Sequence, residues 1–240
     1  MTMTSKTYVL VHGAFHGGWC WREVAQALRA DGHRVFTPTL SGLAERAELL
    51  SQQPTLDTHI DEVAQLIAAE SLRDVLLVGH SFGGTVACGI ADRTPENIRH
   101  LVMLDGHILQ SGSAVTDVAP VEVLDYYQRL RVKNGGSGAI PVPPIDFFGI
   151  TEPAQIAWLE QNLTPQPVET FFTPLKLRHP LGAGLPVTYI TCTEPEFRHT
   201  KAAREFARSI PEWHQLDIAT GHDAMVSAPD KLAELLLALE

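Results

Sequence analysis

The segment VLLVGHSFGGTVACGI, residues 75–90, constrains the fold of this chain more than any other. Its first four residues are aliphatic with no polar alternation, which indicates a strand buried on both faces. Residues 85–90 look like the start of a helix packed on that strand. A strand covered on both sides is typical of a parallel sheet between two layers of helices. Ser81 is therefore expected on the turn between the strand and the helix.

Strand-like and helix-like segments alternate on both sides of this segment. Strands are expected at 8–13, 33–40, 74–80 and 98–105, with helices near 21–31, 56–71 and 83–92. The rhythm resumes late in the chain, with strands at 186–192 and 214–219 and helices near 200–209 and from Pro229 onward. This order predicts the α/β class, with a mostly parallel central sheet flanked by helices and joined by right-handed crossovers.

The rhythm breaks after Asp105. Residues 107–184 contain the turn-rich run NGGSGAIPVPP and short helical stretches such as VEVLDYYQRLRV and EPAQIAWLEQNL, but no strand period. A chain of 240 residues fits one domain with an insertion. We therefore predict a core of residues 1–106 and 185–240, interrupted by a helical cap of residues 107–184. The cap would lie over the carboxyl edge of the sheet, where ligands bind in such folds.

Composition narrows the class of partner. The net charge of −10 argues against nucleic acid or an anionic membrane as the main partner. The amino-terminal residues lack the pattern of a secretory signal, and no stretch has the eighteen or so apolar residues needed to cross a membrane. Cys20, Cys88 and Cys192 are odd in number and have no metal-ligand spacing, which indicates reduced core residues in a cytoplasmic protein. The expected partner is a small neutral or weakly polar molecule, and a homodimer is left open.

The residues around Ser81 form the pattern G-x-S-x-G, completed by Gly79 and Gly83. A nucleophile on a sharp turn between strand and helix needs glycines two residues before and after it, because backbone segments approach closely there. The helix that follows offers unpaired N–H groups and the positive end of a dipole, which favour developing negative charge. The pattern therefore predicts that Ser81 is a catalytic nucleophile.

A serine hydroxyl needs a base to take its proton. Of the eleven histidines, His222 is best placed, because it lies between the last predicted strand and the last helix. Two backbone N–H groups would hold the oxyanion: that of Phe82, just after the nucleophile, and that of Ala14, in the loop HGAFHGG after the first strand. The other histidines expected near this edge, as pocket-lining residues, are His12, His16, His80 and His107.

The segments VLVHGAFHGGWCW, GHSFGG and GHDAM together resemble the α/β-hydrolase superfamily. Within it they are similar to the plant methyl esterase and hydroxynitrile lyase group and to its small bacterial esterase relatives. The resemblance covers the whole chain in motif order, although the insert carries little of it. It implies an α/β-hydrolase fold and a serine hydrolase that needs neither a metal nor an organic cofactor.

The resemblance leaves the third member of the triad open. In this family the acid usually follows the next-to-last strand, and here that place reads Cys-Thr-Glu-Pro, residues 192–195, with Pro195 where an aspartate is expected. Glu194 is one candidate, from one position earlier. Asp105, which ends the strand 98–105, is the preferred one. Asp217 and Asp223 are weaker because they are neighbours of the base. In each case the acid would fix the tautomer of His222.

The related lyases use a lysine just after the catalytic histidine and a threonine in the first loop, whereas this chain has Asp223 and Ala14 at the matching places. A negative charge there would repel cyanide. The preferred function is therefore hydrolysis of a small apolar or aromatic carboxylic ester through an acyl-enzyme. A hydroxynitrile lyase-like C–C lyase and a non-hydrolytic receptor for a small ligand remain alternatives. The apolar pocket is expected from the aromatic residues of the insert, which are Tyr126, Tyr127, Phe147, Phe148, Trp158, Phe171 and Phe172.

Overall fold

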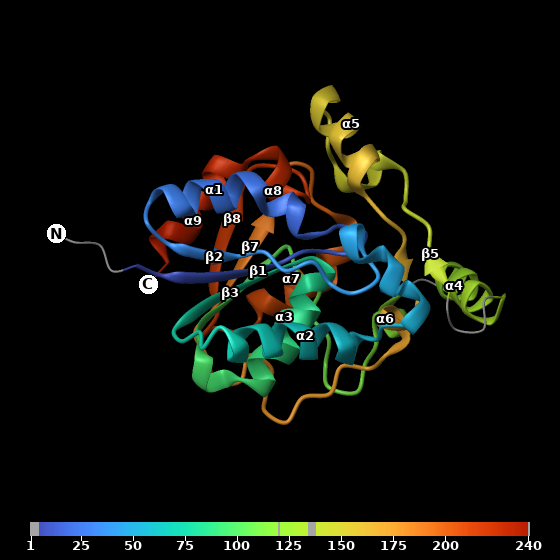
Figure 1. Ribbon diagram of the computed structural model, residues 1–240, viewed down its shortest axis with the longest axis horizontal. Coiled ribbons are helices and arrows are strands. Elements are labelled where there is room, and N and C mark those ends of the chain that lie inside the picture. Colours follow the sequence, from blue (N-terminus) through green and yellow to red (C-terminus); the bar gives the residue numbers. More distant parts are fainter. Residues whose placement is uncertain (1–4, 120, 134–137, 240) are drawn as a thin grey trace.

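A six-stranded sheet forms the centre of the structure, which is a computed structural model that describes residues 5–119, 121–133 and 138–239 (Figure 1). The strands lie in the order β2-β1-β3-β4-β7-β8, and each neighbouring pair is parallel. Their bounds are β1 Thr7–Val11, β2 Arg34–Phe36, β3 Val75–His80, β4 Ile98–Leu104, β7 Val187–Cys192 and β8 His214–Ile218. The predicted α/β class with a parallel central sheet is confirmed.

Helices cover both faces of this sheet. In Figure 1, α1 and α9 lie on one face, and α2 and α3 lie on the other. The α-helices of the core are α1 Arg22–Ala30, α2 Leu56–Ala69, α3 Phe82–Arg93, α7 Lys201–Arg208, α8 Ala224–Ser227 and α9 Pro229–Ala238. Short 3-10 helices join them: η1 Gly18–Trp21, η2 Ala44–Gln52, η3 Pro95–Asn97 and η6 Arg198–Thr200. The amphipathic pattern explains their packing, since α1 buries Val24, Ala25 and Leu28 on one stripe.

The predicted strand 33–40 is shorter in the structure, because β2 ends at Phe36. Pro38 follows two residues later, and proline has no N–H to donate to a strand ladder. The helix η2, residues 44–52, was not predicted from the sequence. Its turns carry no buried residue, so the segment lacks the apolar periodicity by which a helix is recognised.

The segment between β4 and β7 gathers at the side of the molecule opposite to the start of β1 and the end of α9 (Figure 1). It contains η4 Val115–Val118, α4 Val121–Lys133, β5 Ala139–Ile140, η5 Ile145–Phe148, α5 Pro153–Asn162, β6 Gln166–Pro167 and α6 Glu169–Phe172. The antiparallel pair β5 and β6 was not predicted, because two residues per strand are too short to show alternation. Residues 134–137 of the predicted turn-rich run lie outside the described residues. The limits of a cap at 107 and 184 stay a prediction.

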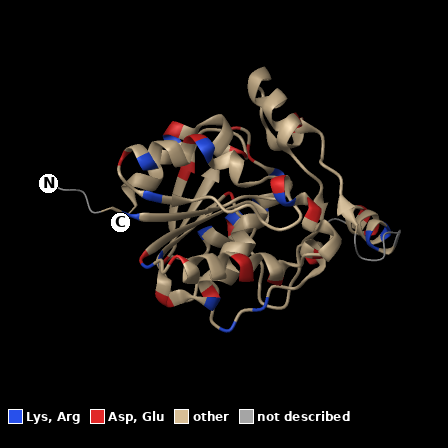
Figure 2. Ribbon diagram, viewed as in Figure 1, with Lys and Arg blue, Asp and Glu red and all other residues tan. Residues whose placement is uncertain are grey.

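Charged residues of both signs are interspersed on the outer helices and loops, whereas the middle of the sheet carries few of either (Figure 2). The three cysteines are buried and not linked to one another, in agreement with their predicted place in the core. Over the described part of the chain, every helix is too short or too polar to cross a bilayer.

The close approach of α3 to β1 sets the position of the turn that carries Ser81. A Cβ atom on Gly83 would lie 2.5 Å from the carbonyl oxygen of His12 and 2.6 Å from that of Val11. Both obstacles are backbone atoms, which cannot rotate away. Gly83 is therefore required for the first turn of α3 to rest on the end of β1.

Gly83→Ala is expected to lower the free energy of unfolding by about 2 kcal/mol or more, because the new methyl group forces α3 away from β1. Gly89→Ala on the same helix is the matched comparison. The three atoms nearest to its Cβ all belong to the side chain of Ile60, with Cδ1 at 2.3 Å and Cγ1 at 2.8 Å, and a side chain can shift where a backbone carbonyl cannot. Urea unfolding of both variants measures the difference. Equal losses would contradict the backbone contact as the reason for Gly83.

Candidate active site

Ser81 occupies a strained turn between β3 and α3. Its backbone has φ 52° and ψ −121°, a conformation that a non-glycine residue adopts only at a cost of about 1–3 kcal/mol. Three backbone hydrogen bonds hold the turn. The N–H of Ser81 donates to Leu104 at 3.2 Å, and its carbonyl accepts from the N–H groups of Gly84 and His107, each at 2.9 Å. The side chain is thus held at the carboxyl edge of the sheet, at the amino end of a helix.

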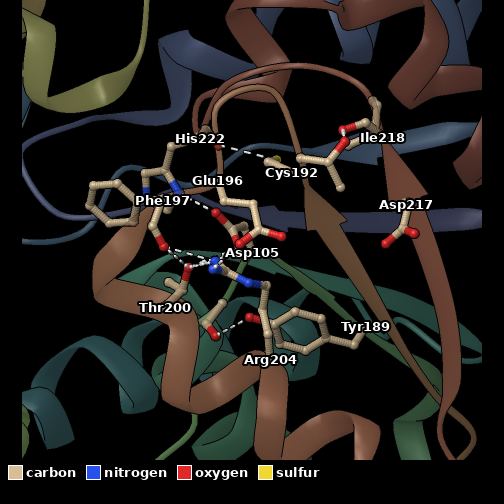
Figure 3. Close-up of polar contacts among 12 residues, drawn as sticks. Asp105, Tyr189, Cys192, Glu196, Phe197, Thr200, Arg204, Asp217, Ile218 and His222 are labelled. Carbon is tan, nitrogen blue, oxygen red and sulfur yellow. Dashed lines mark hydrogen bonds and ion pairs between the residues drawn. The ribbon is translucent and has the colours of Figure 1, made fainter.

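His222 and Asp105 lie together at the same edge. His222 follows β8, and Asp105 directly follows β4, the strand next to β3, which Ser81 directly follows. The Nδ1 atom of His222 is 2.7 Å from Oδ2 of Asp105 (Figure 3). Because a carboxylate accepts, Nδ1 donates and Nε2 is left to accept a proton. Ser81 and His222 line the same small cavity of about 20 Å³. The geometry therefore brings the three predicted residues to one place.

Asp105 is fully buried and is bound by two further side chains. The hydroxyl of Thr200 donates to its Oδ1 at 2.9 Å, and Nη1 of Arg204 lies 3.4 Å from the same oxygen. Arg204 is itself 3% exposed. A buried carboxylate needs such partners, because removing a charge from water without compensation is very costly. This pair was not predicted, because Thr200 and Arg204 belong to no motif in the sequence.

The loop after β1 presents Ala14 toward the serine, and His12 fixes its backbone. The N–H of Leu40 donates to Nε2 of His12 at 3.1 Å, so this nitrogen carries no proton. Nδ1 therefore carries it and donates to the carbonyl of Gly13 at 2.8 Å. Burial lowers the pKa of His12 to about 3, which keeps the ring neutral. In a planar trans peptide the N–H of Ala14 points away from this carbonyl.

Phe82 opens α3, so its N–H is one of the first-turn groups that have no partner within a helix. Ala14 and Phe82 line one cavity together with Ser81. Two backbone donors from different loops are thus available beside the serine. This is the arrangement that stabilises the oxyanion of acyl transfer.

A second buried histidine and carboxylate pair lies behind this loop. Nε2 of His16 is 3.1 Å from Oδ2 of Asp223, and Nδ1 is 2.7 Å from the carbonyl oxygen of Ala14. Both neighbours accept, so both ring nitrogens donate and the ring is an imidazolium. Burial acts to lower the pKa of His16, but the charge and hydrogen bond of Asp223 outweigh it and raise this pKa. Burial acts to raise the pKa of Asp223, but the charge and hydrogen bond of His16 outweigh burial, so the pKa of Asp223 is lowered.

This pair changes one step of the sequence argument. The carboxylate of Asp223 was expected to face the substrate, but it is fully buried and turned toward His16. This site therefore differs from that of the related lyases because it has Asp223 and Ala14 in place of their lysine and threonine. Repulsion by an exposed acid is not the reason. The sequence could not show the contact, because 207 residues separate the partners.

Rings enclose the imidazole of His222. Phe197 stacks on it with the ring centroids 3.8 Å apart, and His80 lies at 4.6 Å. Burial holds the pKa of His80 well below its usual range, and burial lowers the pKa of His107 to about 4. Both histidines are therefore neutral near pH 7, and the ring of His80 packs against the imidazole of His222.

The remaining carboxylates proposed from the sequence lie elsewhere. Glu194 is exposed on the turn after β7, where its N–H donates to the carbonyl of Thr220 at 3.0 Å. Asp217 is exposed and lies 3.9 Å from Arg208. Neither is the carboxylate that contacts the ring of His222. Of the two leading candidates, the structure brings Asp105 to the histidine.

One group of described residues has ligand atoms close enough to share a metal ion: His80, His222 and Asp223, all within 4.8 Å. Each of them already has a partner in the structure. Nδ1 of His222 binds Asp105, Nε2 of His80 lies 3.0 Å from the His222 carbonyl, and Asp223 binds His16. Each member of the group thus has a hydrogen-bond partner in the protein, and Nδ1 of His80 and Oδ1 of Asp223 are the buried atoms of the group that accept or donate no hydrogen bond within the described part of the chain.

A cavity of about 270 Å³ opens in front of Ser81. Its walls are largely apolar and come partly from the segment between β4 and β7, through Val115, Val118, Val123, Tyr127, Phe147 and Phe171. A second hollow of about 420 Å³ lies on the other side of Phe197 and is also lined by His222 and Phe148. The other aromatic residues of the insert pack elsewhere: Trp158 lies against Trp19, Phe172 lies under Arg131, and Tyr126 is 42% exposed.

Comparison with known proteins gives relatives over the whole chain. A carbendazim hydrolyzing esterase from Nocardioides sp. (strain SG-4G) is 37% identical, over 97% of this chain and 98% of that protein. Methylesterase 1 from Arabidopsis thaliana is 34% identical, over 96% of this chain and 94% of that protein. Among solved structures, an extracellular alpha/beta-hydrolase from a Paenibacillus species superimposes with a TM-score of 0.80 at 25% identity, covering 97% and 98% of the two chains.

The model of the alpha/beta hydrolase family matches residues 8–235, which include the turn of Ser81, the strand end of Asp105 and the loop of His222. The resemblance seen in the sequence motifs is thereby confirmed, and this chain belongs to the alpha/beta hydrolase family.

Proposed function

We propose that this protein is a serine carboxylic ester hydrolase in which Ser81, His222 and Asp105 form the catalytic triad. The observation that carries the proposal is the 2.7 Å contact between His222 Nδ1 and Asp105 Oδ2, beside a serine on a strained turn. Esterase relatives over nearly the whole chain support the same reaction class.

The proposed reaction has two halves. Ser81 Oγ attacks the ester carbonyl carbon while its proton passes to Nε2 of His222. The negative oxygen of the tetrahedral intermediate accepts from the N–H groups of Ala14 and Phe82. His222 then gives the proton to the departing alcohol, and an acyl-enzyme remains. Water, deprotonated by the same nitrogen, attacks the acyl carbon, and Ser81 is released with its proton restored.

Asp105 acts on the base rather than on the substrate. Its carboxylate holds the Nδ1 proton of His222, so that Nε2 stays the accepting nitrogen, and it stabilises the imidazolium formed in each half of the reaction. This effect is large because both groups are buried, His222 being 2% exposed and Asp105 0%.

The substrate we propose is a small ester with an apolar or aromatic acyl group. The 270 Å³ cavity in front of Ser81 is lined by Tyr127, Phe171 and several valines, and such walls favour apolar groups. The names of the relatives, an esterase that hydrolyses carbendazim and a methylesterase, are consistent with a small substrate. The cytoplasmic location and the choice between monomer and homodimer stay predictions from the sequence.

The lyase alternative is not favoured. The cation and the hydroxyl that those enzymes use are replaced by Asp223, which is buried against His16, and by Ala14. A receptor without turnover stays as the second hypothesis and is separated from the esterase by the first experiment below.

Ser81→Ala is expected to keep the fold and to lose hydrolysis of p-nitrophenyl acetate on the order of 10⁴-fold or more, because the nucleophile is removed. Intact-protein mass spectrometry after treatment with a fluorophosphonate should show one adduct on the wild-type protein and none on this variant. Ser51→Ala, at an exposed serine, is the matched control and should behave like the wild type. A wild-type protein that takes no label and turns over no ester would favour the receptor hypothesis.

Asp105→Asn is expected to lower kcat on the order of 10⁴-fold, since an amide in this place favours the wrong tautomer of His222. Glu194→Gln should stay close to the wild type because Glu194 is exposed and away from the ring. Steady-state kinetics on one ester measure both variants. A larger loss in the Glu194 variant would show that the acid assignment is wrong.

Val123→Phe is expected to reduce kcat/KM for a p-nitrophenyl ester of a long or aromatic acid at least about tenfold, while the acetate ester changes little. The added ring would fill part of the cavity in which the acyl group is proposed to lie, and overfilling a site costs about 1–3 kcal/mol. Kinetics on the two esters give the ratio. An equal effect on both would place the acyl group outside this cavity.

A further inference from the structure

Two side chains from one helical segment, those of Thr200 and Arg204, contact the carboxylate of Asp105. Thr200 ends η6, and Arg204 lies four residues later in α7, so both side chains come from the same side of the helix. In Figure 3 the guanidinium of Arg204 lies beneath Asp105 and next to Thr200, and His222 lies on the opposite side of the carboxylate. Asp105 is thus held between the catalytic base and this pair.

The hydrogen atoms available to this pair determine its arrangement. The hydroxyl of Thr200 has one proton and two acceptors within reach, Oδ1 of Asp105 at 2.9 Å and the carbonyl of Phe197 at 3.0 Å. Nη1 of Arg204 has two protons, and its shortest contacts are Oγ1 of Thr200 at 2.7 Å and the carbonyl of Phe197 at 2.8 Å. The arginine therefore satisfies the Phe197 carbonyl and leaves the hydroxyl proton for Asp105.

The same contacts connect Asp105 to Phe197, the residue whose ring stacks on His222. The ring of Phe197 stacks on His222, and the carbonyl of Phe197 is bound by Arg204. Nη2 of Arg204 extends outward to Glu196 at 3.2 Å. One buried side chain thus fixes the hydroxyl that binds the acid and the segment that packs on the base.

We propose that Thr200 and Arg204 are positioning residues of the esterase reaction: Arg204 directs the Thr200 hydroxyl at Asp105 and so holds the carboxylate against His222. This inference rests on the proposed function, because it takes Asp105 as the acid of the triad. Neither residue touches the substrate. A purely structural role, in which the pair only neutralises a buried charge, would affect stability without changing the state of the His222–Asp105 contact.

The test uses two pairs of variants of the full chain. Thr200→Val removes the hydroxyl at nearly constant shape, and Thr200→Ser retains it. Arg204→Met removes the charge and all donors, and Arg204→Lys keeps the charge but cannot reproduce the planar set of contacts. Arg208→Met is the control, because Arg208 lies one turn further along α7 in an exposed pair with Asp217.

Three readouts are needed. The first is the split of kcat and KM on one ester, and the second is the pH profile of kcat/KM. The third is the downfield proton NMR signal of His222 Nδ1–H, identified by its loss in Asp105→Asn. Urea unfolding shows whether each variant is folded. Thr200→Val carries the test if Arg204→Met does not fold.

Thr200→Val is expected to lower kcat about tenfold with KM nearly unchanged, the effect of losing one hydrogen bond to a charged group, and to displace the downfield signal. Thr200→Ser and Arg208→Met should match the wild type in all three readouts. Arg204→Met and Arg204→Lys should each lower kcat at least as much and displace the same signal, because neither side chain reproduces the planar set of contacts made by the guanidinium.

An active wild-type enzyme whose Thr200→Val and Arg204→Met variants keep the wild-type kcat, pH profile and NMR signal would overturn this proposal alone. A wild-type protein without esterase activity, in which Thr200→Val still displaces the His222 signal, would overturn the proposed function and leave the positioning contact supported.

Discussion

Burial of carboxylates is the constraint on which the arrangement of this protein depends. Asp105, Asp223 and Asp92 are at most 3% exposed, and a buried charge persists only where hydrogen bonds and opposite charge replace water. Each of them finds its hydrogen-bond partners on segments that are distant in the sequence. Asp105 joins β4 to α7 and to the loop of His222, and Asp223 joins that loop to the loop after β1. Asp92, in α3, accepts from the backbone N–H groups of Arg178 and His179 at 2.8 Å each, which ties the return of the insert to the core.

These contacts hold together the edge of the sheet at which Ser81 and His222 lie. The turn of Ser81 is strained, so it must be held by its surroundings, and Gly83 allows α3 to rest directly on the end of β1. His12, neutral and fixed in one tautomer, holds the peptide plane before Ala14. Ser81, the N–H groups of Ala14 and Phe82, and His222 therefore come from three segments whose relative positions are set by buried polar contacts. Such prearranged groups need no reorganisation when charge develops in the reaction.

The sequence predicted those parts of the site that are recognisable from short local patterns. The elbow at Ser81 and the place of His222 between the last strand and helix follow from glycine spacing and element order. The sequence favoured Asp105 as the acid but left Glu194 as an alternative, because each follows a strand and only their distance from His222 separates them. The pairs Thr200–Arg204 and His16–Asp223 were missed for the same reason. Their role depends on contacts with partners 95 and 207 residues away, for Thr200 with Asp105 and for His16 with Asp223, which no local pattern records.

The strand order explains how Asp105, the acid that we propose, can reach His222 in a chain that holds Pro195 at the position where relatives carry the acid. β4 lies between β3, which leads to Ser81, and β7, which leads to Glu194 and Pro195. Parallel neighbours end at the same edge about 4.8 Å apart, so an acid moved from β7 to β4 stays within reach of the histidine loop. The move also brings the carboxylate nearer to the centre of the sheet, where water is excluded. An acid at Asp105 then requires a cation and a hydroxyl from the nearest element that packs below it. That element is the helix after β7, which supplies Arg204 and Thr200.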